Sequence, residues 1–345
     1  MNRHVNIPVF IPHEGCKNDC VFCNQRTITG ISKHNDDNVK NTIDTALSTI
    51  ENDAVVEIAF FGGSFTGIGI ERMTRLCDTA YDYVKSGRVK SIRLSTRPDY
   101  IDEEILNILK DRGVTHIELG IQSMIQLVLD ASKRGHTTSD TEKACEMIND
   151  YGFILGGQMM IGLPCSTLED EIYTAQKIVE MGAKQARIYP CVVFQKTQLC
   201  QMAKNGDYTP LTVEEAVERS ARVYRIFKEN NINILRIGLQ SSDNLSSEDQ
   251  VYAGANHPAL GELVLSRANL YRILDTIDYY RENLQEDYLG KTLKIECNKA
   301  DLSKVIGHKK TNVEIIRNSA LESGFSDTKI IQNENIKEND LYIHF

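Results

Sequence analysis

Short apolar runs alternate with longer amphipathic stretches along most of the chain. The runs resemble strands and cover residues 6–13, 55–63, 91–97, 116–123, 154–164 and 185–194. The stretches between them, for example 102–113 and 167–182, carry apolar residues at helical spacing and stop at a glycine. Strands that alternate with helices usually form a parallel sheet, and near-continuous apolar runs suit strands covered on both faces. The pattern predicts an α/β fold, a partial or nearly closed parallel (β/α) barrel with a small C-terminal α+β module.

The alternation ends near residue 240. The polar loop 241–250 interrupts it, and a helix over roughly 258–285 follows. Residues 291–345 then read as strand, helix, turn, helix, strand and strand. We therefore expect three parts: a barrel at 1–240, an extension with a linker helix at 241–290, and a small module at 291–345.

Composition narrows the possible environments and partners. The 345 residues are 41% apolar and carry a net charge of −9, which argues against a surface that is basic throughout and coats nucleic acid. Residues 291–345 differ slightly, with nine Lys and Arg against eight Asp and Glu. The sequence shows no apolar run of about 18 residues, and its first residues do not resemble a signal peptide. We expect a soluble cytoplasmic protein with no membrane partner.

Three of the nine cysteines lie close together after the first strand. Cys16, Cys20 and Cys23 share one polar loop, while the other six are scattered. Thiolates at this spacing suit an iron–sulfur cluster, because a tight loop can deliver three sulfurs to neighbouring irons and leave the fourth iron open. A zinc site completed by His13 or His34 is one alternative, and a set of inert buried thiols is the other.

Further candidate residues follow the other strands. In a parallel barrel the chemistry lies at the carboxyl ends of the strands. Gly62, Gly63 and Ser64 follow the second strand, and glycines without side chains let carbonyl groups approach a ligand closely. A simple tight turn is the alternative there. Arg134 can bind a carboxylate through two hydrogen bonds, although a solvated surface arginine is an equally good interpretation.

The segment IPHEGCKNDCVFCNQ (11–25) resembles the cluster loop of radical S-adenosylmethionine (SAM) enzymes. This resemblance implies a four-iron, four-sulfur cluster on Cys16, Cys20 and Cys23, with SAM bound to the open iron and cleaved to a 5′-deoxyadenosyl radical. It also implies an electron donor of the ferredoxin or flavodoxin type. In this family's pattern SAM is contacted by residues of the rim, which here are Phe22, Gly62, Gly63, Ser64, Ser95, Gln122, Arg134 and Gln158.

The resemblance also assigns parts of SAM to these residues. Phe22 packs against the adenine, the turn at 62–64 accepts the methionine ammonium, and Arg134 pairs with the carboxylate. Gln122 and Gln158 contact the ribose and methionine portions. The sequence departs from the common pattern at Ser95 and Gln158, where acidic residues or His are frequent.

Several shorter segments resemble one branch of that superfamily. STRPDYID (95–102), IELGIQS (117–123), RGHT (134–137) and QMMIGLP (158–164) are similar, in this order, to the radical SAM half of the Elongator catalytic subunit, which modifies wobble uridines of tRNA. The likeness covers residues 5–240, and we expect no counterpart of that subunit's acetyltransferase domain. The resemblance therefore implies radical chemistry on a tRNA or rRNA substrate and assigns no catalytic side chain.

The C-terminal part carries a second candidate site. VIGHKKTNVEIIR (305–317) resembles the loop of a KH domain, in which a Gly-x-x-Gly turn between two helices clamps a nucleic-acid backbone. The resemblance implies that His308, Lys309 and Lys310 contact RNA, with Lys310 in place of the second glycine. A solvated turn between two helices is the alternative.

Two other functions fit the same residues. The motif Gly162-Leu163-Pro164 also resembles oxygen-independent coproporphyrinogen oxidases, so a radical reaction on a small molecule such as a tetrapyrrole is one alternative. The other is an RNA-binding module whose cluster is structural or senses the redox state.

Overall fold

The computed structural model describes residues 4–11, 14–17, 19–24, 35–51, 53–239, 249–284 and 287–345. The chain forms two compact units, and each unit draws on two separate stretches of sequence. The first unit contains residues 1–212 and 226–258, and the second contains 213–225 and 259–345. The expected boundary in the loop 241–250 falls almost wholly outside the described residues, so the division into three domains stays a prediction.

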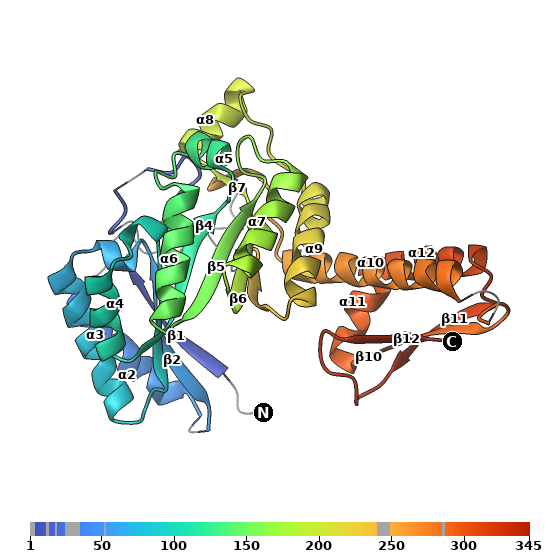
Figure 1. Ribbon diagram of the computed structural model, residues 1–345, viewed down its shortest axis with the longest axis horizontal. Helices are drawn as coiled ribbons and strands as arrows, with labels where there is room; N and C mark the ends of the chain where they lie inside the picture. The colour runs from blue at the N-terminus through green and yellow to red at the C-terminus, as the bar shows by residue number, and fades with distance from the viewer. Residues whose placement is uncertain are drawn as a thin grey trace. The chain divides into compact units, whose positions relative to one another are not determined.

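A seven-stranded parallel sheet forms the centre of the first unit (Figure 1). Its strands are β1 (His4–Ile11), β2 (Val55–Gly62), β3 (Ser91–Thr96), β4 (Val114–Gln122), β5 (Ile154–Ile161), β6 (Gln185–Pro190) and β8 (Asn233–Ile237). They pair in the order β1-β2-β3-β4-β5-β6-β8, so each crossover adds the next strand at the same side. Within the described residues β1 and β8 are the two edges, which makes the curved sheet a partial barrel. The predicted parallel β/α barrel is confirmed.

Helices and short turns connect these strands. The helices are α2 (Val39–Thr49), α3 (Ile70–Lys85), α4 (Glu103–Asp111), α5 (Gln126–Ala131), α6 (Thr138–Asp150), α7 (Leu168–Glu180), α8 (Gln198–Asn205) and α9 (Val213–Glu229). Single 3-10 turns are η1 (Asp36–Asn38), η2 (Phe65–Gly67) and η3 (Pro98–Tyr100). In Figure 1, α3, α4, α6 and α7 lie along one side of the curved sheet, its outer side.

Local sequence explains where several helices begin. Thr137 and Thr167 each cap a helix. The threonine hydroxyl accepts from the backbone N–H of the aspartate three residues later, Asp140 or Asp170, and the carboxylate of that aspartate accepts from the threonine N–H. These capping boxes satisfy two N–H groups that helix geometry leaves without partners. Helix α4 begins at Asp102, whose carboxylate accepts from the N–H of Ile105.

The two faces of the central sheet differ in character. Leu119 and its neighbour Gly157 face outward, where a Cβ on Gly157 would meet Ile178 of α7. Glu118 and Gln158 occupy the next positions along these strands and face inward, and Arg93 forms a buried ion pair there with Glu118, 3.2 Å from Nη2 to Oε1. The expectation of near-continuous apolar strands is therefore wrong for the inner face. Helices cover the outer face, whereas the inner face carries charged side chains that pair with one another.

The sixth predicted strand is in fact two strands. β6 ends at Pro190, and β7 (Val192–Phe194) leaves the parallel sheet to pair with β9 (Val251–Gly254) in antiparallel orientation. Proline has no N–H to donate to a further ladder position, which favours an end to the pairing there. Apolar character continues through Cys191, which is buried, so the break is invisible in the hydrophobic pattern.

The second unit packs helices on one face of a small sheet. Its strands β10 (Thr292–Cys297), β11 (Asp327–Gln332) and β12 (Leu341–His344) lie in the order β11-β10-β12, with β10 parallel to β11 and antiparallel to β12. Its other elements are α10 (Leu260–Asn283), η4 (Lys299–Asp301), α11 (Leu302–Ile306), η5 (His308–Lys310) and α12 (Thr311–Glu322). Ile273, Leu293 and Ile316 are among the residues of its buried core. The predicted order of elements over 291–345 is confirmed.

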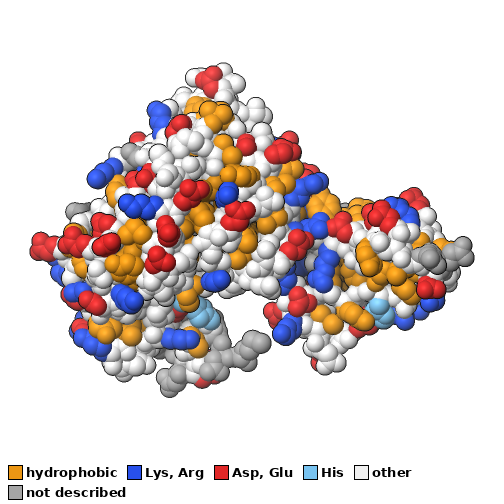
Figure 2. Space-filling model, viewed as in Figure 1, with side chains coloured by type: hydrophobic (Ala, Val, Ile, Leu, Met, Phe, Trp, Pro, Cys, Tyr) orange, Lys and Arg blue, Asp and Glu red, His pale blue; other side chains and the backbone are white. Residues whose placement is uncertain are grey.

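The surface carries charges of both signs. On the face shown in Figure 2, acidic and basic side chains are interspersed. This mixture agrees with the net charge and with the expectation that the chain is not basic throughout. Among the helices of the described residues, none combines the length and the apolar character needed to cross a lipid bilayer.

Candidate functional site

The cysteine loop leaves β1 and packs closely against the turn that follows β2. The N–H of Gly63 donates to the carbonyl oxygen of Ile11 over 2.7 Å. A Cβ on Gly63 would lie 1.9 Å from the Glu14 carbonyl oxygen, and one on Gly62 would lie 2.8 Å from the Ile11 carbonyl oxygen. The predicted glycine pair therefore holds two loops together, and its contact with SAM remains a prediction.

The glycine of the cysteine loop is equally constrained. Gly15 has a φ of +77°, and a Cβ on it would lie 2.1 Å from the Ser64 carbonyl oxygen. Gly67 closes the same contact, because its Cβ would lie 2.3 Å from the Gly15 carbonyl oxygen. Sequence reasoning missed Gly15 and Gly67. The available signal was that the loops after two neighbouring strands, β1 and β2, both contain glycines.

The three predicted ligands lie in one loop beside polar groups of other rim segments. Cys16 Sγ lies 3.3 Å from Ser64 Oγ, and Cys20 Sγ lies 3.5 Å from Nη1 of Arg134. Cys23 donates its N–H to the Cys20 carbonyl oxygen over 3.0 Å. Cys20 is buried, while Cys16 and Cys23 are half-buried. The hydrogen bond between Cys23 and Cys20 thus closes the loop, and Ser64 and Arg134 contact it from two other segments.

Two kinds of metal centre place their ligands differently. In the parts of the chain that the structure describes, no three His, Cys, Asp or Glu side chains converge as ligands of one metal ion. Ligands of a single ion converge on one point, whereas three thiolates of a cluster each bind a different iron and stand further apart. The choice between the cluster and a zinc ion stays a prediction. His13 and His34, the alternative zinc ligands, lie outside the described residues.

Two guanidinium groups belong to the surroundings of Cys20. Arg134 donates through Nη2 to the Gly120 carbonyl oxygen over 2.8 Å while its Nη1 faces the sulfur. Arg97 makes a two-point ion pair with Asp99, at 2.8 and 2.9 Å, and also interacts electrostatically with Cys20. Burial acts to lower the pKa of Arg97, but the hydrogen bond and charge of Asp99 outweigh it, so the pKa is raised. Two positively charged side chains therefore act on this side of the cysteine loop.

Gln122 ends β4 in an uncommon conformation. Its φ is +67°, and the ladder with β5 shifts register between Gly120 and Gln122. Its side-chain oxygen is buried and accepts no hydrogen bond from the described residues. Left-handed backbone costs a residue other than glycine about 1–2 kcal/mol, and such strain concentrates at functional sites. A buried acceptor without a partner suits a hydroxyl or ammonium group of a ligand.

Ser95 and Gln158 contact each other on the inner face of the sheet. Nε2 of Gln158 donates to Ser95 Oγ and to Glu118 Oε2, over 3.0 Å in both cases. Glu118 is paired with Arg93 at 3.2 Å and with Arg187 at 2.5 Å. Sequence reasoning missed these three charged residues. The sequence signal that could have indicated these residues is a charged side chain in strands whose other residues are mostly apolar.

Phe22 lies against an apolar cluster on the same rim. Leu163, from the loop after β5, and Val21 belong to that cluster. The backbone of Val21 fixes the loop further, since its N–H donates to Ser132 over 3.1 Å and its carbonyl accepts from Leu199 over 2.8 Å. Segments that follow β1, β2, β3, β4 and β5 therefore meet around the three cysteines, as expected for the carboxyl ends of parallel strands.

The predicted RNA contacts form a separate candidate site in the second unit. His308, Lys309 and Lys310 make up turn η5 between α11 and α12, and all three side chains are exposed. The backbone is left-handed at Lys309 and Lys310, with φ of +52° and +66°, and φ is +82° at Gly307. Nδ2 of Asn312 anchors the next helix by donating to carbonyl oxygens of α10 and α11, over 3.2 Å each.

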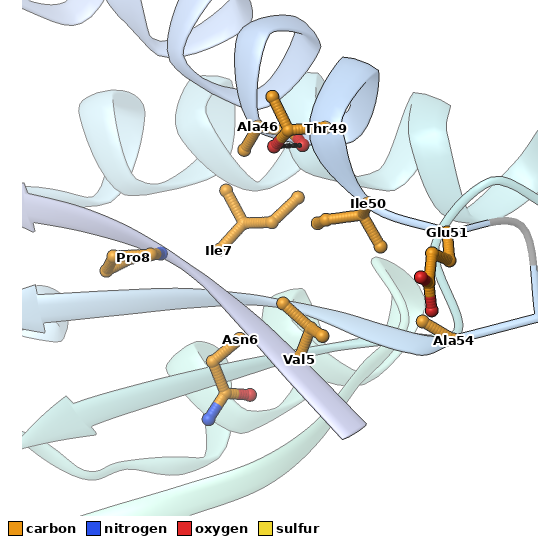
Figure 3. Close-up of a pocket in the computed structure, with 9 residues that line it drawn as sticks. All are labelled: Val5, Asn6, Ile7, Pro8, Ala46, Thr49, Ile50, Glu51 and Ala54. Atoms are coloured by element: carbon orange, nitrogen blue, oxygen red, sulfur yellow. Dashed lines mark hydrogen bonds between the residues drawn. The ribbon is translucent and has the colours of Figure 1, made fainter. Parts of the chain in front are cut away.

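A pocket of about 270 Å³ lies away from these residues, between β1 and the end of α2 (Figure 3). Val5 and Ile7 of the strand and Ile50 after the helix form its apolar wall, as Figure 3 shows. Glu51 also lines it. The pocket lies toward the amino end of β1, whereas the cysteine loop follows the carboxyl end, so it is not part of the candidate site.

Comparison with known families identifies the class of the protein. The family model of the radical SAM superfamily matches residues 10–178, and that of the radical SAM C-terminal domain matches residues 183–272. The chain belongs to the radical SAM superfamily and is an enzyme.

Its curated relatives belong to the branch that the short motifs indicate. The tRNA uridine(34) acetyltransferase of Methanocaldococcus jannaschii is 37% identical over 134 residues, 38% of this chain and 25% of that protein. The enzyme of the same name from Methanocaldococcus infernus is 31% identical over 186 residues, 47% of this chain and 34% of that protein. Human Elongator complex protein 3 is 29% identical over 179 residues, 51% of this chain and 32% of that protein. The matches thus span a quarter to a third of these relatives. The predicted resemblance to the radical SAM half of the Elongator catalytic subunit is confirmed.

Solved structures agree on the fold. The archaeal Elp3 of Methanocaldococcus infernus superposes with a TM-score of 0.62 at 21% identity, over 82% of this chain and 68% of that chain. Coproporphyrinogen III oxidase (HemN) of Escherichia coli gives a TM-score of 0.50 at 16% identity, over 66% of this chain and 53% of that chain. Both support a radical SAM barrel.

Proposed function

We propose that the protein binds a four-iron, four-sulfur cluster through Cys16, Cys20 and Cys23, cleaves SAM, and modifies RNA. The observation that carries the first two parts is the loop itself, whose sulfurs lie beside Ser64 and Arg134 on the rim of a radical SAM barrel. The RNA substrate is supported by the relatives, which are named as enzymes of tRNA uridine 34.

We propose that the predicted rim residues hold SAM. The observations that support this role differ from residue to residue. Gln122 offers a buried acceptor, and Arg134 offers a guanidinium next to the cysteine loop. Glu118 fixes the amide of Gln158, which in turn donates to Ser95, so the two side chains present one orientation to a ligand. For Phe22, Gly62, Gly63 and Ser64 the support is their place on the rim.

The chain's own residues prepare the site for radical chemistry in two ways. The apolar cluster with Val21 and Leu163 excludes water from one side of the cysteine loop. The ion pairs of Glu118 leave a rigid polar inner face below the rim. The cluster, when bound, supplies the electron for SAM cleavage, which we expect a ferredoxin or flavodoxin to deliver.

Anaerobic reconstitution tests the cluster and the cleavage together. Wild-type protein is loaded with iron and sulfide, then assayed for iron content, electron paramagnetic resonance (EPR) and 5′-deoxyadenosine after addition of SAM and a strong reductant. Cys20→Ala should lose both iron and product. Cys165→Ala is the matched control, because Cys165 is an exposed cysteine after β5 outside the triad. Iron retention by C20A, or no SAM cleavage by loaded wild type, contradicts the proposal.

The turn η5 is proposed as the place where the second unit contacts RNA phosphate. Lys309 and Lys310 are exposed beside a left-handed backbone that brings their N–H groups to the start of α12. In binding to total tRNA, K309A with K310A should reduce the salt dependence, by a slope of about 0.7 for each phosphate that the variant no longer neutralises. The double variant K329A with K337A removes the same charge from exposed positions elsewhere in the unit and serves as control. An equal salt dependence in both double variants would contradict the assignment of η5.

The substrate itself is tested by mass spectrometry of the nucleosides of total RNA with and without the gene. Loss of one modified nucleoside supports the proposal and identifies the product. An unchanged nucleoside profile, together with SAM cleavage by the pure enzyme, would favour a small-molecule substrate such as a tetrapyrrole. Absence of SAM cleavage by cluster-loaded protein would favour a binding module.

A further inference from the structure

We propose that Arg97, oriented by Asp99, is a positioning residue that stabilises negative charge at the cysteine loop and raises the reduction potential of the cluster bound there. This inference rests on the proposed function, because it requires that the loop hold a redox-active cluster. Arg97 was not among the predicted site residues. It follows β3, the third strand of the barrel, at the carboxyl edge where the rim forms.

Arg97 is buried more deeply than a charged side chain normally is. Only 1% of its side chain is exposed. Nε and Nη2 of the guanidinium donate to the two carboxylate oxygens of Asp99. The N–H bonds of the third nitrogen, Nη1, do not take part in this ion pair. Nη1 is buried and donates to none of the described residues. A buried cation that keeps an N–H without an acceptor is unfavourable unless a further acceptor is present in the functional state.

The charge of Arg97 acts on the cysteine loop. Arg97 interacts electrostatically with Cys20, whose sulfur also faces Arg134. The turn that follows Arg97 contacts the same loop, since the hydroxyl of Tyr100 accepts from the N–H of Lys17 over 3.1 Å. The segment from 97 to 100 is thus fixed against the cysteine loop, where an anionic cluster would lie within the field of Arg97.

The other titratable groups around Arg97 leave this charge in place. His136 faces Arg134, Arg97 and Asp99, and burial followed by the two arginines lowers its pKa to about 3. Its imidazole is therefore neutral at physiological pH and adds no charge. Asp99 opposes Arg97, but its side chain is 24% exposed and is partly screened by water, whereas the guanidinium is not. We therefore expect the charge of Arg97 to outweigh that of Asp99 at the cysteine loop.

A fixed positive charge changes the cost of adding an electron. Reduction makes the cluster one charge more negative, so a buried cation nearby stabilises the reduced form more than the oxidised one. Charge, hydrogen bonds to sulfur and burial set cluster potentials. Removal of the cation should lower the midpoint potential, while removal of the opposing carboxylate should raise it.

The two substitutions therefore have opposite expected effects, which separates charge from structure. Reconstituted wild type, R97Q and D99N are compared by redox titration followed by EPR, with iron content measured on the same samples. We expect R97Q to shift the midpoint to a more negative value and D99N to a more positive one. R97K keeps the charge without the two-point ion pair and should lie between wild type and R97Q.

Arg112→Gln is the matched control. Arg112 also pairs with an aspartate through Nε, 2.7 Å from Asp78 Oδ1, and it acts electrostatically on the buried thiol of Cys77, which is outside the triad. Its variant should keep the wild-type potential. Shifts of R97Q and D99N in the same direction, or no shift in either at full iron content, overturn the inference. If R97Q does not fold, D99N and R97K still decide it. If wild type takes up no cluster, the proposed function fails, and this inference fails with it.

Discussion

Glycine-to-alanine substitutions in and near the two loops that pack together can separate two physical effects, backbone strain and steric clash. Gly69 has a φ of +97°, a ψ of 140° and open space where a Cβ would lie, so Gly69→Ala tests backbone strain without a clash. Gly63 lies outside that region of φ, but its Cβ would meet the Glu14 carbonyl oxygen at 1.9 Å, so Gly63→Ala tests the clash alone. Gly15→Ala combines a φ of +77° with a Cβ contact of 2.1 Å.

The magnitudes follow from the two effects. Backbone strain at such a positive φ costs an alanine about 1–3 kcal/mol, and forcing atoms into a filled space costs about 1–3 kcal/mol. G69A should lose stability by the first amount, G63A by the second, and G15A by about 2–6 kcal/mol, the sum of both. A contact to backbone cannot be relieved by a rotamer change, so G63A belongs at the upper end of its range.

Urea unfolding of the apoprotein followed by far-ultraviolet circular dichroism measures these losses, and iron uptake after reconstitution reports on the loop. G15A and G63A should take up less iron than wild type, because the clash moves the cysteine loop off the turn after β2. G69A should take up the full amount. If G63A is as stable as wild type, or if G15A loses no more stability than G69A, the loops are not in the contact described.

Three further changes probe the ion pairs, the buried histidine and the helix caps. Glu118→Gln leaves Arg93 and Arg187 without their shared carboxylate and should destabilise the apoprotein by about 3–5 kcal/mol in urea unfolding, and a loss below about 1 kcal/mol would contradict the ion pairs. His136 has a folded pKa of about 3 against 6.5 unfolded, so its stabilising effect is full above pH 6.5 and falls by about 1.4 kcal/mol per pH unit below it. His136→Gln should therefore reduce the loss of stability between pH 7 and pH 5 by about 2 kcal/mol, and an equal loss in both proteins would show that the ring is not buried neutral. Thr137→Ala and Thr167→Ala should each cost about 1 kcal/mol, or about 2–4 °C in thermal melting, whereas Thr79→Ala in the middle of α3 should cost less than either.

Period and spacing in the sequence were enough for the fold of the barrel. Each of the strand-like runs corresponds to a strand of the sheet, because helix-covered outer faces require apolar residues at Leu94, Leu119 and their equivalents. The break at Pro190 could not be predicted, since hydrophobicity continues through Cys191 while the pairing partner changes. Partners of strands are set by contacts between segments far apart in the chain, which a local pattern does not contain.

For the site, the sequence indicated the cysteines and two of their neighbours, Ser64 and Arg134, but not the charged groups further from the loop. Cys16, Cys20 and Cys23 stand out because of their spacing. The position of Arg97 after a strand places it on the rim, but its burial could not be predicted, since an arginine there has the same appearance whether it is buried or solvated. Its place near Cys20 follows only from the packing of the turn after β3 on the cysteine loop.

Interleaving of the two compact units has a consequence for how the protein is made and divided. Residues 213–225 belong with the C-terminal helices, where Glu218 pairs with Arg267 over 2.7 Å, although β8 of the barrel follows them in the chain. A ribosome therefore releases part of the second unit before the last barrel strand, and neither unit can finish folding from one continuous segment. A fragment that begins at residue 241 would lack Glu218, the partner of Arg267 and Tyr271, and one that begins at 291 would also lack the part of the core that α10 supplies, so gain or loss of this module by a single cut in the gene would damage both halves.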